Sequence, residues 1–156
     1  MAHRIIAQNR GKGGPSYRAP SHRYKAELRH LGKNDALIFG NVVDIEHDPA
    51  RHAPIAFTQL ESGEKAYILA TEGLGVGDTI SWGPGGVVKN GNTLPLREIP
   101  VGAYVCNIEA RPNDGGKFVR SSGVQALVIG KADDGRVGVR MPSGKNKWFN
   151  GVCMAT

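Results

Sequence analysis

The sequence predicts an all-β fold: two consecutive small barrels preceded by a basic, extended N-terminal arm. Gly (22) and Pro (9) make up about a fifth of the 156 residues, which indicates short elements joined by tight turns. Short runs of aliphatic and β-branched residues alternate with these turns, as is typical of small barrels. No long segment has the period of an amphipathic helix, and only residues 24–31 could form one or two helical turns.

The arm, residues 1–33, is the most basic part of the chain. It carries eight cations and one acid, a net charge of 8 − 1 = +7, whereas residues 34–100 carry 4 − 9 = −5 and residues 101–156 carry 8 − 4 = +4. Glycine and proline rule out a long regular element in the arm, so it should be disordered until a polyanion neutralises it. A solvated tail that aids solubility is the alternative; membrane binding is disfavoured because the arm has no apolar face.

The first barrel is expected to span residues 34–84, followed by a linker over residues 85–94. Its strands are predicted at residues 36–45, 54–60, 65–70 and 79–82. A hairpin turn at 61–64 joins the second strand to the third. The glycine-rich run 73–77 lacks the G-x-G-x-x-G spacing and a following helix, so we expect a turn there and no phosphate site.

The second barrel is expected to span residues 95–156. Its strands are predicted at residues 101–109, 124–130 and 136–141, with a last strand from residue 147 that runs out near residue 156. Within 136–141 the alternation places arginine and glycine on one face and Val137, Val139 and Met141 on the other. Cys106 and Cys153 are predicted to be small buried residues, too few for a disulfide scaffold.

No catalytic constellation stands out. His47, Asp48 and His52 lie close in sequence but lack H-E-x-x-H spacing. A structured turn explains them better, with Asp48 initiating it and Arg51 pointing a cation outward. We therefore expect no enzyme, although a hydrolase or metal enzyme built on this cluster remains an alternative. No apolar run is long enough for a membrane-spanning helix, and the start of the chain lacks the apolar stretch of a secretion signal.

Several turns resemble the archaeal branch of the universal large-subunit ribosomal protein two family. The similar blocks cover the chain in order and lie at residues 17–25, 43–51, 91–96, 112–117, 120–123 and 141–144. This resemblance implies an oligonucleotide-binding (OB) fold followed by an SH3-like barrel. It also implies a cytoplasmic ribosomal component that binds large-subunit ribosomal RNA and neighbouring ribosomal proteins, with no membrane, small-molecule substrate or cofactor; RNA-associated magnesium is left open.

The sequence departs from that family at its end. Members continue past the block matched by residues 153–156 into a basic extension, so no residue here inherits the role of its histidine-bearing loop near the peptidyl-transferase region. The resemblance thus implies a chain lacking that extension and leaves the completeness of the second barrel open. Met154 stands where the family usually has arginine, which removes one expected phosphate contact.

Both the residues and the resemblance point to RNA binding in which cations meet phosphates and flat side chains stack on bases. A free-standing single-strand binder or translation factor with the same barrels is the alternative. The predicted RNA-binding residues are Arg4, Arg10, Lys12, Tyr17, Arg18, His22, Arg23, Tyr24 and Lys25 on the arm, Arg51 in the first barrel, and Lys117, Arg120, Arg140 and Lys145 in the second.

Overall fold

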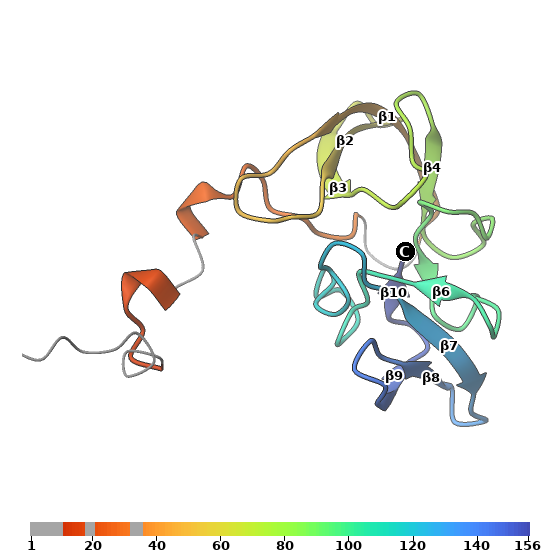
Figure 1. The fold of residues 1–156 in the computed structure, drawn as a ribbon. Helices are drawn as coiled ribbons and strands as arrows, with labels where there is room; N and C mark the ends of the chain where they lie inside the picture. The colour runs from red at the N-terminus through yellow and green to blue at the C-terminus, as the bar shows by residue number, and fades with distance from the viewer. Residues whose placement is uncertain (1–10, 18–20, 32–35) are drawn as a thin grey trace, which may run out of the picture.

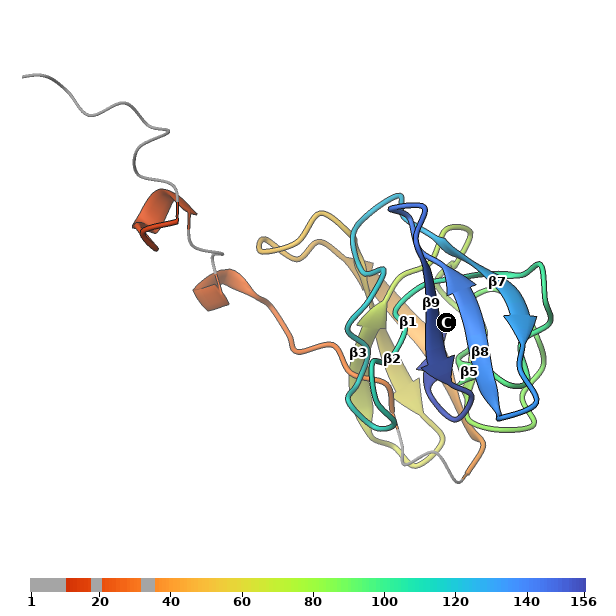
Figure 2. The ribbon, with the colours of Figure 1, turned by 90° about the horizontal axis from the view of Figure 1, so that it is seen from below.

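Two β modules lie side by side, and the short turns η2 (Pro15–Tyr17) and η3 (Ser21–Arg23) lie away from both of them (Figures 1 and 2). The computed structural model describes residues 11–17, 21–31 and 36–156. The predicted RNA-binding residues Arg4, Arg10 and Arg18 lie outside the described residues. No helix in the described ranges is long and apolar enough to cross a membrane.

The first module is a four-stranded antiparallel sheet. Its strands are β1 (Ile38–Glu46), β2 (Ile55–Leu60), β3 (Lys65–Leu69) and β4 (Thr79–Trp82), in the order β3-β2-β1-β4. A register shift between Val42 and Asp44 bends β1 where it leaves β4 and follows β2. Apolar side chains that alternate along the strands form the core, with Trp82 and Ile80 each 1 % exposed. These four strands lie where the sequence predicts them.

The second module is built on a larger core. Strands β6 (Tyr104–Val105), β7 (Ala126–Lys131), β8 (Arg136–Arg140) and β9 (Asn146–Asn150) form one antiparallel sheet, and β5 (Leu94–Pro95) pairs with β10 (Met154–Ala155). Val137 and Val139 of β8 point into the core while Arg136 and Arg140 remain exposed, as the alternation predicts. The core contains only aliphatic residues, one cysteine and one phenylalanine among its buried members.

Two predicted strands of the second module are wrong in extent. The expected strand over 101–109 is reduced to β6, because Asn107 adopts a left-handed φ of 47° and Ile108 pairs with Phe118 instead. The expected final strand is divided into β9 and β10. The side chain of Asn150 accepts a hydrogen bond from the N–H of Val152 at 3.0 Å and closes a turn between the two pieces.

Residues 24–31, which we call the strap, do not form the one or two helical turns that the sequence allowed. The strap runs along the molecule without regular structure, and short 3-10 turns occur before it at η2 (Pro15–Tyr17) and η3 (Ser21–Arg23). Leu28 is only 3 % exposed and packs with Ile55 and Leu69 of the first module. Burial of Leu28 outweighs the weak local preference for a helix.

The expected fold class, an all-β protein with OB-type and SH3-like modules, is confirmed. The two modules are joined by backbone contacts. Thr93 forms an isolated parallel β-bridge with Trp82, and the N–H of Thr93 donates a hydrogen bond to the carbonyl of Ser81 at 2.8 Å. The boundaries at residues 33/34, 84/85 and 94/95 stay a prediction.

Candidate nucleic-acid interface

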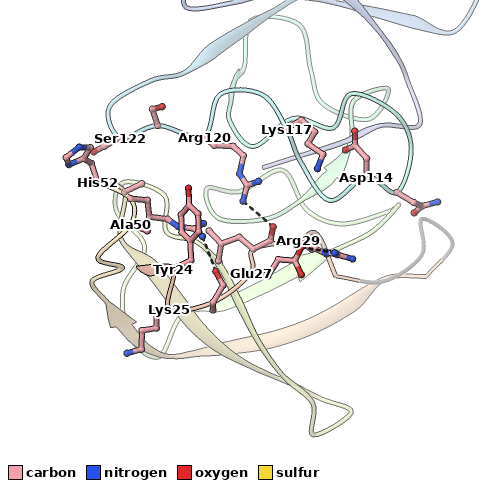
Figure 3. A pocket seen from close by; sticks show the side chains of 16 residues that line it. Tyr24, Lys25, Glu27, Arg29, Ala50, His52, Asp114, Lys117, Arg120 and Ser122 are labelled. Carbon is pink, nitrogen blue, oxygen red and sulfur yellow. Dashed lines mark hydrogen bonds and ion pairs between the residues drawn. The ribbon is translucent and has the colours of Figure 1, made fainter. Parts of the chain in front are cut away.

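A basic groove of about 1300 Å³ lies between the strap and the loops of both modules. Three segments line it: the strap itself, the loop before β2, and residues 113–122 of the second module. Cations outnumber acids by five to two among its lining residues. The cations are Lys25, Arg29, Arg51, Lys117 and Arg120, and the acids are Glu27 and Asp114. Figure 3 shows Arg120 and Lys117 pointing toward the strap from the second module.

Backbone hydrogen bonds fasten the strap to the first module. The N–H of Lys25 donates to Asp48 Oδ1 at 3.2 Å, and the guanidinium of Arg51 donates to the carbonyl of Ala26 at 3.0 Å. Strap carbonyls and N–H groups therefore have partners even though the strap belongs to no sheet, as buried backbone requires. The side chain of Lys25 also forms an ion pair with Glu46 of β1.

Asp48 is the anchor of the loop before β2. Its side chain is fully buried; Oδ1 accepts a hydrogen bond from the N–H of Ala50 at 3.0 Å, and Oδ2 forms an ion pair with Arg51 Nε at 2.8 Å. Burial by itself raises the pKa of Asp48, but the hydrogen bonds from Ala50 and Lys25 and the charge of Arg51 outweigh it and hold the pKa below its ordinary value. The carboxylate of Asp48 thus has all its contacts with groups of the protein itself.

Arg51 does not point outward as the sequence predicts. Its side chain is 17 % exposed, and the guanidinium carbon lies 4.6 Å from the centre of the Tyr24 ring. The buried carboxylate of Asp48 attracts this cation inward, because an unpaired buried charge is costly. Arg51 therefore contributes positive charge to the groove from a fixed position.

Arg120 fastens the strap to the second module. Its guanidinium donates to the carbonyl of Leu28 at 3.1 Å and to that of Gly116 at 3.0 Å. Burial lowers the pKa of Arg120, and the nearby charge of Arg51 lowers it further, yet a guanidinium stays protonated at any physiological pH. Two fixed cations thus form the floor of the groove.

The rim of the groove carries side chains that are accessible to a ligand. Lys117 and His52 are exposed and lie toward different edges, with the exposed hydroxyl residues Ser121 and Ser122 nearby (Figure 3). Arg29 is 69 % exposed and paired with Glu27 at 2.7 Å. Exposed ion pairs are weak, so a phosphate can displace Glu27 from Arg29 at little cost. Arg29 and His52 were not among the predicted RNA-binding residues; the sequence pointed to His52 only as part of the cluster with His47 and Asp48.

The loop after residue 108 is organised by Glu109, which sequence reasoning missed. Its carboxylate is 1 % exposed and accepts bonds from the N–H groups of Asn113 and Gly115, both at 3.2 Å, and of Met154 at 2.9 Å. No local pattern reveals this role, because Met154 is 45 residues away. Glu109 thereby holds the loop that carries Lys117 next to Met154 of β10.

Gly115 and Gly116 form a turn that packs against the protein itself. Both are buried; a Cβ on Gly115 would lie 3.1 Å from the Arg29 side chain, and one on Gly116 would lie 2.3 Å from Asn107 Oδ1. Their φ values of 79° and 87° also favour glycine. The packing and the backbone conformation of this turn therefore account for both glycines.

The structure gathers only part of the predicted set in one place. Tyr24, Lys25, Arg51, Lys117 and Arg120 line the groove. Six other predicted residues lie outside the groove, on the arm before the strap or in the second module, and all six are exposed. These residues are Lys12, Tyr17, His22, Arg23, Arg140 and Lys145.

The remaining candidate groups have structural surroundings. His47 and His52 are exposed while Asp48 is bound by its own chain, and no three His, Cys, Asp or Glu side chains of the described ranges come together as a metal-binding group. Burial raises the pKa of both Cys106 and Cys153 to about 11, so both thiols stay protonated at neutral pH.

Two small β modules with a cationic groove between them are typical of the class of nucleic-acid-binding proteins. Comparison with known families agrees. A family described as Ribosomal Proteins L2, RNA binding N-terminal domain, matches residues 3–81, and one described as Ribosomal Proteins L2, C-terminal domain, matches residues 89–156. The chain belongs to the ribosomal protein L2 family.

Individual relatives are similar along the whole chain. The large ribosomal subunit protein uL2 of Methanoculleus marisnigri is 88 % identical over 156 residues, which are all of this chain and 65 % of the relative. The uL2 proteins of Methanoregula boonei and Archaeoglobus fulgidus are 67 % and 51 % identical, over 100 % and 99 % of this chain and 65 % of each relative. The chain thus spans about 65 % of the length of these relatives.

Proposed function

We propose that this chain is a structural constituent of the large ribosomal subunit in the cytoplasm, where it binds and stabilises folded large-subunit ribosomal RNA. The observation that carries this proposal is the convergence of five cations from three separate segments on one groove. Membership of the L2 family, whose N-terminal domain is described as RNA-binding, supports it. The role is recognition and stabilisation, with no reaction catalysed.

The groove suits a phosphate backbone that passes between the modules. The guanidinium groups of Arg51 and Arg120 are already held by Asp48 and by strap carbonyls, so they supply positive potential without losing side-chain freedom on binding. Lys117 on the rim is free to contact a phosphate directly, and His52 and Ser122 can donate hydrogen bonds. Neutralised phosphates release counterions, so affinity should fall steeply with salt.

The division of the chain follows from this proposal. We propose an RNA-binding arm at 1–33, an OB-type barrel at 34–84, a linker at 85–94 and an SH3-like barrel at 95–156. The predicted arm residues Lys12 and Arg23 would extend the contact beyond the groove, with Tyr17 and His22 as stacking candidates. The acids of the 34–100 segment, whose net charge is −5 (4 − 9), would face solvent or neighbouring ribosomal proteins because they repel phosphate, while Arg51 faces the RNA.

A pair of matched lysine variants tests the groove. K117Q removes an exposed cation of the rim, whereas K89Q removes an exposed cation outside the groove. Filter binding to a folded large-subunit RNA fragment should show weaker binding for K117Q and a salt slope reduced by about one, with K89Q close to the unaltered chain. Equal effects of the two substitutions would contradict the groove.

The same assay separates the ribosomal role from a free-standing binder. A ribosomal constituent should bind the folded fragment far more tightly than a short unstructured oligonucleotide of similar charge. Equal affinity for the two ligands would favour the free-standing module instead.

A further inference from the structure

Trp148 of β9 packs over Gly138 on the outer face of the second module. Its side chain is half exposed, and the register places it directly opposite Gly138 of β8. A Cβ on Gly138 would come within 3.2 Å of the Cη2 and Cζ3 atoms of the indole, and within 3.2 Å of Ile129 Cγ1. The absence of a side chain at Gly138 therefore lets the six-membered ring approach the sheet closely, while half of the Trp148 side chain stays exposed to solvent.

The surroundings of this ring are polar and positively charged. On the same face, the register pairs Arg140 with Asn146 on one side of Trp148 and Arg136 with Asn150 on the other, and all four are exposed. Asp134 forms an ion pair with Arg136 at 2.6 Å, whereas Arg140 forms no ion pair within the described part of the chain. None of these residues lines the basic groove.

We propose that Trp148 is a stacking platform for an unpaired nucleobase of RNA, with Arg140 contacting the adjoining phosphate. The proposal rests on the proposed function and adds a second contact, away from the groove. A flat aromatic face accepts any base, and an adjacent cation neutralises the phosphate that comes with it.

The chemistry of the face favours a base over a protein partner. The inner side of the indole is already covered by Gly138 and Ile129, so a single planar surface remains available. Two arginines and two asparagines lie around it, and the charge of Arg140 complements a ligand that carries a phosphate. Single-stranded RNA offers both a planar base and a negative charge.

Tryptophan fluorescence can follow this site alone. The chain has two tryptophans, and Trp82 is 1 % exposed in the core of the first module. Emission of the whole chain should be quenched by a large-subunit RNA fragment containing a single-stranded loop, and much less by a fully paired duplex. Quenching that is absent at saturating RNA, as judged by filter binding, would overturn the platform while leaving the proposed function intact.

Substitutions complete the test. W148L should weaken binding of the single-stranded RNA by roughly 5- to 100-fold, and W148F should restore most of the loss because it keeps a stacking surface. K117Q binds RNA more weakly, but at saturating RNA its emission should be quenched as fully as in the unaltered chain, which separates this site from the groove. Unchanged RNA affinity for W148L, or a change in emission that follows protein concentration and not RNA, would overturn the proposal.

Discussion

The guanidinium of Arg120 donates a hydrogen bond to the carbonyl of Leu28, 92 residues earlier in the chain, at 3.1 Å. This bond joins the strap to the second module, while Lys25 and Arg51 join the strap to the first module through Asp48 and Ala26. The strap thus links the two modules and closes one side of the basic groove. Its side-chain and backbone contacts hold Arg51 and Arg120 in fixed positions in the groove.

Substitution of Arg120 should loosen the strap. R120M keeps an unbranched apolar stem but removes the guanidinium and with it the bonds to Leu28 and Gly116. We expect the free energy of unfolding to fall by about 2–3 kcal/mol, since hydrogen bonds from a charged donor contribute roughly 1.5–3 kcal/mol. Urea denaturation measures this loss, and hydrogen exchange should accelerate at the strap amides. R111M, which alters an exposed arginine, is the control; equal effects would contradict the linking role.

Removing the charge of Glu109 should destabilise the loop that carries Lys117. In E109Q one carboxylate oxygen is replaced by an amide nitrogen, which cannot accept a hydrogen bond. At least one of the bonds from the N–H groups of Asn113, Gly115 and Met154 is therefore lost at a buried position. The expected cost is about 2–3 kcal/mol. Thermal or urea unfolding measures it. E72Q, at an exposed position, should have little effect; a similarly small effect for E109Q would show that the buried carboxylate is dispensable.

Stability should fall on mild acidification because of His30. Its Nε2–H donates to the carbonyl of Asn107 at 2.6 Å. Burial lowers the pKa of His30 below 6.5, outweighing the bond to Asn107 and the charge of Glu109, which raise it. The unfolded chain therefore binds a proton that the folded chain resists, and stability decreases as the pH falls below 6.5, by at most about 1.4 kcal/mol per pH unit. A stability that increases as the pH falls below 6.5 would instead require a raised pKa of His30 in the folded chain.

The variant H30Q isolates this effect. Glutamine can still donate to the carbonyl of Asn107 but does not titrate. The unfolding free energy, measured at several pH values from 7.5 to 5, should vary less in H30Q than in the unaltered chain. Identical pH profiles for the two proteins would assign the acid sensitivity to other groups.

Both thiols should react slowly in the folded chain. Because burial raises the pKa of Cys106 and of Cys153 to about 11, the thiolate fraction at neutral pH is about 100-fold lower than for an ordinary cysteine. Alkylation by iodoacetamide should therefore be at least about 100-fold slower in buffer than in urea. Comparable rates in the two solvents would indicate that the thiols are exposed by rapid opening.

The sequence was sufficient for elements whose determinants are local. The four strands of the first module follow from alternating side chains between glycine and proline turns, and the face of β8 follows from its period of two. The cations of the strap and of the 113–122 loop could be named, but not their convergence. That depends on bonds between residues as far apart as His30 and Asn107.

Other features escaped prediction because the same residue types serve two purposes. The sequence predicts Arg51 to be an exposed surface cation, whereas in the structure its guanidinium is paired with the buried carboxylate of Asp48. Glu109 resembled any strand-end acid, although three N–H groups converge on it. Trp148 began an expected strand without any sign that Gly138 lies beneath it.

The central claim, that the chain's cations bind ribosomal RNA phosphates, is tested most directly by the salt dependence of affinity. A variant with Lys12, Arg23 and Lys117 replaced by glutamine should be compared with one in which Lys65, Lys89 and Arg97, also exposed, are replaced in the same way. On a folded large-subunit RNA fragment, the first variant should lose about two to three units of the slope of log affinity against log salt, and the second almost none. Equal slopes for both variants and the unaltered chain would contradict the account.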